Sequence, residues 1–302
     1  MSWQIHVCPC CGGDRFEARG AMLAGFVAAR AMNEAPRTCR LCRCFECGVL
    51  FYDHRLAEDE IKRLYDGYRG EAYFAARHRW EPFYTRATND SLGGGDEIAW
   101  RRQIYHRTLA PWAVGDAKLD SVLDYGGDRG QLIVEGPGRH HYVYEISGRN
   151  ALDGVTLIDN EAGLIGRKFD LVLACHLLEH MSEPFAGLVQ IAGHVRTQGL
   201  LYLEVPFDRP RFEDIPRGTW YTSYLNVLSK SDRAVILAGL LGDAFLGRIG
   251  RMPPIGFYKA HEHLQHFDLK SLRMLIERAK LELLCCEQHA ARGIVTALAR
   301  VP

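Results

Sequence analysis

The segment from Ser121 to Gly130 constrains the fold of this chain more than any other stretch. It reads Ser-Val-Leu-Asp-Tyr-Gly-Gly-Asp-Arg-Gly, which is typical of a buried strand that ends in a glycine turn and opens onto a helix. Glycines at the carboxyl end of a parallel strand let the backbone approach a ligand, and an acidic side chain there can hold the ligand's polar groups. The segment indicates a nucleotide-binding turn, although an ordinary tight turn has the same signature.

The chain after Leu119 alternates short apolar runs with helical ones, which predicts an α/β fold with a Rossmann-like, doubly wound sheet. Because the last two of the expected strands lie close in sequence, we expect them to pair antiparallel. The seven expected strands are residues 121–125, 142–146, 155–158, 170–174, 199–205, 282–286 and 294–300.

Two amphipathic helices are expected between these strands. Ser182 is positioned to cap a helix that has Pro184 in its first turn, and Asp268 is positioned to cap a later one. The residues from 207 to 260 are too many for a simple connection, so we expect a lid or substrate-binding insertion with a helix near 226–241. Four cations of this region could meet a phosphate or be solvated: Arg209, Arg211, Arg217 and Lys259.

Seven of the ten cysteines lie before residue 48. Cys8 and Cys11 form one closely spaced pair and Cys44 and Cys47 another, and each pair is followed by a glycine that allows a tight turn around a metal ion. Four thiolates fill a tetrahedral zinc site, so the predicted Zn²⁺ would be structural. Free or redox-active thiols are the alternative, and Cys39 with Cys42 is a rival second pair.

The composition limits the partners of the chain. Among its 302 residues, 37 basic and 37 acidic side chains cancel to a formal charge of zero, so a nucleic-acid partner is not expected. The longest apolar stretch, residues 234–246, contains two glycines and an aspartate and is too short to cross a bilayer. We therefore expect a protein of the cytoplasm with no membrane partner; the oligomeric state stays open.

Acidic residues follow the second and third expected strands. Glu145 comes about 20 residues after the first glycine of the turn, where a carboxylate in this class of fold accepts hydrogen bonds from ribose hydroxyls. Asp159 and Glu161 follow the third strand, and one of them either contacts an adenine amino group or is a solvated loop acid.

Taken together, these motifs resemble the class I S-adenosylmethionine-dependent methyltransferases that carry an amino-terminal zinc-binding segment. The motifs are the two cysteine pairs, Val122–Gly127, Phe169–His180 and Tyr202–Pro206. The resemblance implies S-adenosylmethionine as cofactor, structural zinc on Cys8, Cys11, Cys44 and Cys47, and a cofactor site formed by Asp124, Gly126, Gly127, Gly130, Glu145, Asp159, Cys175 and His176. One departure is Asp128, which stands where many relatives have a glycine.

The segment His261–Phe267 (HEHLQHF) resembles sugar methyltransferases, in particular the C-methyltransferases of deoxysugars. In those enzymes a Glu-His pair lies beside the reacting methyl group, which implies His263, with Glu262, as the catalytic base and His176 as a second candidate. Those enzymes also carry a further carboxyl-terminal domain that this sequence does not show, so O-methylation is expected over C-methylation. The expected acceptor is a small polar molecule, either a sugar or a nucleotide-linked sugar.

The resemblance implies three regions: a zinc-binding segment at 1–55, a helical and aromatic-rich connector at 56–118, and a methyltransferase domain at 119–302 with its insertion at about 207–260. Gly93-Gly94-Gly95 marks a turn in the connector, whose aromatic residues either pack between domains or line a substrate pocket. Two other functions remain open. One is an RNA methyltransferase, for which a basic face would be expected; the other is a non-catalytic module in which Asp128 blocks the cofactor.

Overall fold

The structure is a computed structural model that describes residues 3–91, 94–112 and 119–302. The chain divides into two compact units, each assembled from two separate segments. The first unit comprises Met1–Ser91 and Asp208–His266, and the second comprises Leu92–Phe207 and Phe267–Pro302. Gly93 of the predicted turn, and residues 113–118 at the end of the predicted connector, lie outside the described residues.

The second unit is built on a seven-stranded sheet with the order β13-β14-β10-β9-β6-β7-β8. Its five parallel strands pair side by side from β8 to β10, whereas β14 is antiparallel to both of its neighbours. The seven strands and the antiparallel final pair are therefore confirmed. The strands are β6 (Ser121–Tyr125), β7 (His140–Tyr144), β8 (Val155–Ile158), β9 (Phe169–Cys175), β10 (Val195–Pro206), β13 (Glu282–His289) and β14 (Ile294–Arg300).

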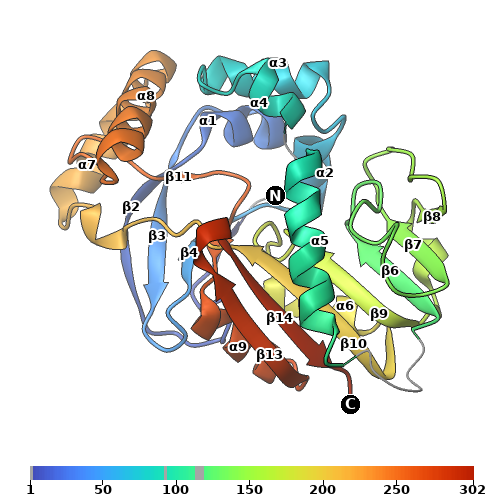
Figure 1. Cartoon of the computed structure of the whole chain (residues 1–302). Helices are drawn as coiled ribbons and strands as arrows, with labels where there is room; N and C mark the ends of the chain where they lie inside the picture. Colours follow the sequence, from blue (N-terminus) through green and yellow to red (C-terminus); the bar gives the residue numbers. More distant parts are fainter. Residues whose placement is uncertain (1–2, 92–93, 113–118) are drawn as a thin grey trace. The chain divides into compact units, whose positions relative to one another are not determined.

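Helix α5 (Gly95–Leu109) covers one face of this sheet (Figure 1). Tyr105 of α5 shares a buried apolar cluster with Leu171 and Leu173 of β9. The two leucines are two residues apart, so the alternation of side chains along a strand places both on the face that α5 covers. Two further helices, α6 (Pro184–Ala192) and α9 (Leu269–Arg278), contact strands of the same sheet.

Capping was predicted correctly at one of these helices and wrongly at the other. Asp268 caps α9 as expected, since its Oδ1 accepts a hydrogen bond from Ser271 N at 2.8 Å. The N-cap of α6 is Glu183 and not Ser182, because the helix starts one residue later with Pro184 as its first residue. Proline suits that position since the first helical N–H has no partner within the helix.

The helix expected after the glycine turn does not form. Residues 128–135 make a series of turns in which Gly130 O accepts hydrogen bonds from both Ile133 N and Val134 N at 3.2 Å. Only five residues separate Gly130 from Gly136, and Pro137 and Gly138 follow. Glycine and proline are the poorest helix formers, so this segment is too short and too interrupted for a regular helix.

Strand β7 also differs from the expectation, because it spans His140–Tyr144 and not 142–146. Ile146 is exposed, so burial does not hold it in the sheet. The earlier end of the strand leaves Glu145 as the first residue beyond it.

The first unit contains a five-stranded sheet with the order β11-β2-β3-β4-β12 and a small pair, β1 (Trp3–Gln4) with β5 (His54–Arg55). The central strands β2, β3 and β4 come from the amino-terminal segment, and β11 and β12 come from the segment 208–266. Figure 1 shows the orange β11 beside the blue β2. The strands are β2 (Phe16–Leu23), β3 (Thr38–Cys44), β4 (Leu50–Tyr52), β11 (Lys259–Ala260) and β12 (Gln265–His266).

Short helices surround this sheet. The predicted single helix near 226–241 is two helices, α7 and α8, because Ser231 caps α8 with its hydroxyl and so interrupts the run. The helices are α1 (Gly25–Val27), which continues into a π-helical turn at Ala28–Met32, α2 (Glu58–Tyr65), α3 (Glu71–Trp80), α4 (Arg86–Ser91), α7 (Thr219–Leu228) and α8 (Asp232–Ile249). A membrane-spanning helix was not found among the described residues.

The segment that was expected as an insertion shares one core with the amino-terminal segment. Phe26 and Tyr73 lie in the same buried cluster as Tyr221, Leu225 and Phe257. Burying such side chains contributes about 1.5–3 kcal/mol each, so this shared core is a main source of stability for the unit. Residues 208–266 thus fold as part of the first unit.

Candidate active site

The glycine turn after β6 surrounds a buried carboxyl group. Asp124 is 1% exposed, and neither of its side-chain oxygens has a hydrogen-bond partner among the described residues. Burial raises the pKa of Asp124 to about 7. A Cβ atom on Gly127 would lie 2.1 Å from Asp124 Cγ, so a side chain at 127 would take the space beside the carboxyl group. A buried polar group without a partner, in a turn that only glycine permits, fits a polar ligand such as the predicted cofactor.

Glu145, just beyond β7, stabilises this turn through hydrogen bonds to backbone N–H groups. Its Oε2 accepts a hydrogen bond from Asp128 N at 3.1 Å, and its Oε1 accepts one from Ser147 N at 2.9 Å. Each carboxylate oxygen has two lone pairs, so both oxygens keep the capacity to accept a ribose hydroxyl. Asp159, the other predicted acid, is exposed and accepts a hydrogen bond from Asn160 Nδ2 at 2.6 Å.

Asp128, the residue that departs from the family pattern, has a defined place. Its backbone is in the left-handed region at φ 55°, which asparagine and aspartate tolerate better than most residues. Its carboxylate accepts hydrogen bonds from Arg149 Nη1 at 2.7 and 2.8 Å and from Gln131 Nε2 at 3.1 Å. The side chain is thus paired with Arg149 and does not cap a helix.

At the carboxyl end of β9, Cys175 and His176 follow each other. Burial raises the pKa of the Cys175 thiol well above its usual range, so the sulfur stays neutral. His176 has a left-handed backbone with φ 51°, a costly conformation for histidine that is typical of functional sites. Its Nε2 lies 3.1 Å from Glu204 Oε1 and its Nδ1 lies 3.4 Å from Glu179 Oε1.

The surroundings of His176 decide its charge. Burial by itself would lower the pKa of His176, but the carboxylates of Glu179 and Glu204 outweigh it and raise the pKa to about 9. At neutral pH the imidazole is therefore a cation. A cationic imidazole donates hydrogen bonds and cannot accept a proton, which weakens the case for His176 as a general base.

Arg101 of α5 completes this buried network, and no pattern in the sequence pointed to it. Its Nε donates to Glu204 Oε1 at 2.6 Å, and the hydroxyl of Tyr202 donates to Glu204 Oε2 at 3.2 Å. Burial raises the pKa of Glu204, but its contacts with His176 and Arg101 outweigh burial and lower the pKa overall. Glu204 belongs to the Tyr202–Pro206 motif, but its partner comes from a helix about 100 positions earlier in the chain.

In the first unit, Asp208 brings His263 and His266 together. Asp208 Oδ2 lies 2.6 Å from His263 Nδ1, and Asp208 Oδ1 lies 3.0 Å from His266 Nδ1. Burial would raise the pKa of Asp208, but the hydrogen bonds from the two imidazoles hold it well below its usual range, so the carboxylate stays ionised. The carboxylate that orients His263 is therefore Asp208, which the sequence did not reveal, and not the neighbouring Glu262.

Glu262 instead points into a buried cluster of the first unit. It accepts a short hydrogen bond from the hydroxyl of Tyr73, and its Oε2 lies 3.4 Å from Arg77 Nη1 and 3.5 Å from His261 Nδ1. His261 also pairs with Glu81 at 2.8 Å. Burial lowers the pKa of His261, but Glu81 and Glu262 outweigh it and raise the pKa to about 9. Burial by itself would raise the pKa of Glu81, but His261 and Arg77 outweigh it and lower the pKa to about 2.

The four predicted zinc ligands lie together. The sulfur atoms of Cys8, Cys11, Cys44 and Cys47 are all within 4.8 Å of one another, with Cys8 to Cys47 at 3.6 Å and Cys11 to Cys44 at 3.5 Å. A tetrahedral zinc ion with Zn–S bonds of about 2.3 Å separates its ligands by about 3.8 Å, so the four sulfurs fit one ion. The rival pair, Cys39 and Cys42, is not part of this group of sulfur atoms.

Both cysteine turns have the geometry that the sequence predicted. Gly12 and Gly48 have φ values of 81° and 79°, and each donates its N–H to the carbonyl of the first cysteine of its pair. A residue with a Cβ atom is strained in this conformation. The glycines therefore let each turn close around the sulfur atoms.

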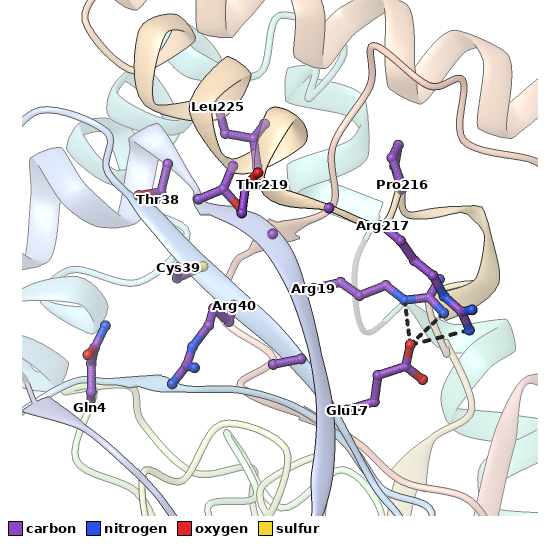
Figure 2. Close-up of a pocket in the computed structure, with 14 residues that line it drawn as sticks. Gln4, Glu17, Arg19, Thr38, Cys39, Arg40, Pro216, Arg217, Thr219 and Leu225 are labelled. Carbon is purple, nitrogen blue, oxygen red and sulfur yellow. Dashed lines mark hydrogen bonds and ion pairs between the residues drawn. The ribbon is translucent and has the colours of Figure 1, made fainter.

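The four cations that were considered for a phosphate each contact a different partner. Figure 2 shows a pocket of the first unit in which Arg19 and Arg217 both pair with Glu17. The other three cations have separate partners: Gly48 O for Arg209, Asp214 for Arg211 and Asp243 for Lys259. Since each of the four cations has its own partner, they do not form a common phosphate site.

Comparisons with known proteins gave a family model and similar solved structures. A family model described as a methyltransferase domain matches residues 97–285, well over half of the chain. One similar solved structure is the N-methyltransferase NodS from Bradyrhizobium japonicum WM9, with 13% identity and a TM-score of 0.37; the match covers 69% of this chain and 98% of that one. A search of curated proteins gave no significant match.

Another similar structure is the magnesium protoporphyrin IX methyltransferase ChlM from Synechocystis PCC 6803 with bound SAH. It shares 17% identity with a TM-score of 0.39, and the match covers 76% of this chain and 97% of that one. These similarities are too low to bear on the acceptor. The family match and the strand order of the sheet instead identify the family: this chain belongs to the methyltransferase-domain family and is a class I S-adenosylmethionine-dependent methyltransferase.

Proposed function

We propose that this chain methylates a hydroxyl oxygen of a sugar or a nucleotide-linked sugar, with His263 as the general base. The observation that carries the proposal is the 2.6 Å contact between His263 Nδ1 and Asp208 Oδ2. A carboxylate on one ring nitrogen fixes the tautomer, so that the other nitrogen accepts the proton. A hydroxyl group must lose its proton as it is methylated, whereas a carbon acceptor needs a more elaborate activation. O-methylation is therefore favoured over C-methylation.

The residues in contact with His263 and Glu262 have roles in this scheme. S-adenosylmethionine, when bound, would supply an electrophilic methyl group, with the thioether S-adenosylhomocysteine as the leaving group. His263 Nε2 takes the hydroxyl proton, and Asp208, a positioning residue, stabilises the resulting imidazolium. Glu262 accepts hydrogen bonds from the acceptor while Tyr73 and Arg77 hold its carboxylate in place. Such alignment lowers the barrier because the reacting atoms are already in line.

The residues that would hold the cofactor are in the second unit. Asp124 and Glu145 offer carboxyl oxygens to polar groups of the cofactor, and Gly126, Gly127 and Gly130 allow its close approach. Cys175 and His176 line the end of β9, and Asp159 follows β8. His176, as a cation at neutral pH, suits a hydrogen bond to a carboxylate better than proton transfer.

Calorimetry with S-adenosylmethionine tests the cofactor site. Gly127→Ala should weaken binding by about tenfold or more, equivalent to about 1.4 kcal/mol, because its Cβ would collide with Asp124. Gly95→Ala is the matched control, since a Cβ there meets nothing within 4 Å. Equal affinity in the two variants would refute the assignment of the turn, and a wild-type protein without measurable affinity would refute methyl transfer altogether.

The acceptor is tested by incubation with S-adenosylmethionine and a panel of monosaccharides and nucleotide-linked sugars, followed by mass spectrometry. Nuclear magnetic resonance then locates the methyl group on the product. A product methylated on oxygen supports the proposal. Methylation of a carbon, or of RNA alone, would overturn it.

The thiolate cluster of Cys8, Cys11, Cys44 and Cys47 is proposed to bind one structural Zn²⁺. With four sulfur ligands the ion has no open position, so its contribution is to the stability of the first unit. Metal analysis should find one zinc ion per chain in the wild type and none in Cys44→Ser. Cys42→Ala should keep the ion, and loss of zinc in that variant but not in Cys44→Ser would transfer the site to the rival pair.

A further inference from the structure

A cavity of about 380 Å³ lies in the first unit, between the end of α3, helix α8 and the strand β11. Its volume is within the range of roughly 300–1,000 Å³ that is typical of small-molecule sites. None of the residues discussed for the cofactor or the zinc ion lines it. Its walls contain six apolar or aromatic residues, namely Phe83, Tyr84, Leu246, Met252, Phe257 and Tyr258.

The aromatic part of the wall includes an unusually exposed ring. Phe83 is 65% exposed, although Tyr84 and Phe257 beside it in the wall are buried. Tyr84 is held firmly, since its hydroxyl donates to Asn89 Oδ1 at 2.9 Å and the guanidinium carbon of Arg77 lies 4.0 Å from its ring centroid. An exposed ring next to a fixed one offers a flat apolar surface to a ligand.

The polar part of the wall contains three cations and two carboxylates, and each cation is paired with a carboxylate. Arg77 pairs with Glu81 at 3.1 Å, His261 pairs with Glu81 at 2.8 Å, and Lys259 pairs with Asp243 at 2.6 Å. The wall therefore presents many hydrogen-bond donors and acceptors with little excess of charge. A free phosphate or a cation would gain little from charges that are already paired, whereas hydroxyl groups, which both donate and accept, can pair with both kinds of side chain.

This polar wall is continuous with the Glu262 cluster. Arg77 Nη1 and His261 Nδ1, which belong to two of the lining residues, lie 3.4 and 3.5 Å from Glu262 Oε2. Glu262 precedes His263 in the chain. Two lining residues of the cavity thus contact Glu262, the sequence neighbour of the proposed base.

We propose that this cavity binds the sugar ring of the acceptor, with the apolar face of the ring on Phe83 and its hydroxyls on Arg77, Glu81 and His261. The inference rests on the proposed function and adds a location for the acceptor within the first unit. An aromatic surface beside a set of paired donors and acceptors is what an uncharged, hydroxyl-rich ring requires.

Phe83→Ala is the variant that tests this site, because an exposed ring can be removed without opening the core. Saturation-transfer nuclear magnetic resonance and calorimetry would measure binding of a panel of free hexoses, 6-deoxyhexoses, UDP-glucose and dTDP-glucose, with UDP and dTDP as probes of the nucleotide alone. For the tightest sugar, Phe83→Ala should weaken binding by about tenfold, equivalent to about 1.4 kcal/mol. Phe83→Tyr, which keeps the ring, should restore it.

The matched control is Phe245→Ala, which removes an exposed phenylalanine of α8 that does not line the cavity. It should bind the sugar as the wild type does. His261→Gln is a second test inside the polar wall, and thermal unfolding shows whether that buried variant still folds. Equal sugar affinity in Phe83→Ala and Phe245→Ala would overturn the proposal.

The remaining outcomes separate this inference from the proposed function. If UDP or dTDP binds as tightly as the corresponding nucleotide-linked glucose, the sugar ring is not the recognised group and the inference fails. If the wild type binds S-adenosylmethionine but no sugar of the panel, this inference fails while methyl transfer stands. If free hexoses and nucleotide-linked sugars both bind and both depend on Phe83, the ring itself is the ligand, as we propose.

Discussion

Each of the two units contains a histidine beside a carboxylate, and the two pairs differ in their surroundings. In the second unit, His176 lies between Glu179 and Glu204, on a left-handed backbone and next to the buried Arg101. In the first unit, His263 pairs with Asp208 at the surface, where the two side chains are 30% and 41% exposed. The comparison shows that a neighbouring carboxylate alone does not make a histidine a general base. Burial and further charges decide whether the imidazole is protonated.

The largest expected effect comes from removing the proposed base. His263→Gln should lower turnover by about 10² to 10⁴-fold, the usual contribution of general base catalysis, while the affinity for S-adenosylmethionine stays unchanged. The measurement is turnover at saturating acceptor and cofactor, together with calorimetry. If His263→Gln keeps its turnover and His176→Asn loses it, the assignments of the two histidines are reversed.

The next effect concerns the buried ion pair behind His176. Arg101→Met leaves Glu204 without its guanidinium partner, so the free energy of unfolding should fall by about 3–5 kcal/mol. Arg196→Met is the matched control in the same unit, because it breaks the half-exposed pair with Asp170 and should cost less than about 1 kcal/mol. Denaturant unfolding measures both. Equal losses would mean that burial does not distinguish the two pairs.

A smaller effect is expected at the positioning residue of the first unit. Asp208→Asn keeps the size of the side chain but removes the charge that stabilises the imidazolium, so turnover should fall by about 10 to 10²-fold with little change in the acceptor KM. The pH profile of turnover should shift as well, which a purely structural role would not produce. Asp232→Asn, in the first turn of α8, is the control and should behave as the wild type.

The smallest effect is the pH dependence of stability that comes from His176. Its folded-state pKa of about 9 is above the usual value of 6.5, so protonation stabilises the folded state. This contribution is complete below about pH 6.5 and is lost as the pH rises to about 9. Because a third of the side chain is exposed, we expect only about 1–2 kcal/mol.

The comparison of wild type with His176→Asn isolates this contribution, since asparagine accepts the left-handed backbone. Unfolding free energies measured from pH 6 to pH 10 should converge as the pH rises. A constant difference between the two proteins over that range would show that His176 does not change its charge there.

The sequence predicted the sheet well because local patterns encode strands. The strands at 121–125, 155–158 and 294–300 have the expected bounds, and Gly126, Gly127 and Gly130 lie in the expected turn. The prediction of a helix after that turn was wrong, because glycines and a proline interrupt the segment. The single helix expected near 226–241 was wrong because a serine cap divides it.

The site was predicted less completely than the fold. The family resemblance led to Glu262, His263 and His176. Tyr73 contacts Glu262, Asp208 contacts His263 and Arg101 contacts Glu204 beside His176, and all three are distant in sequence from these residues. A single sequence has no local signal for such a partner, because the contact depends on how segments pack. Asp208, directly after the Tyr202–Phe207 run, could have been suspected only from its place at the end of a strand.

The sequence by itself determined the class of the fold and the two cysteine turns, since each depends on neighbours within a few positions. Only the tertiary structure decided which carboxylate meets which histidine, that residues 208–266 complete the sheet of the first unit, and that Cys44 and Cys47 rather than Cys39 and Cys42 meet Cys8 and Cys11. The physical reason is that burial and charge act through space, so the proton state of a side chain follows from packing and not from its place in a motif.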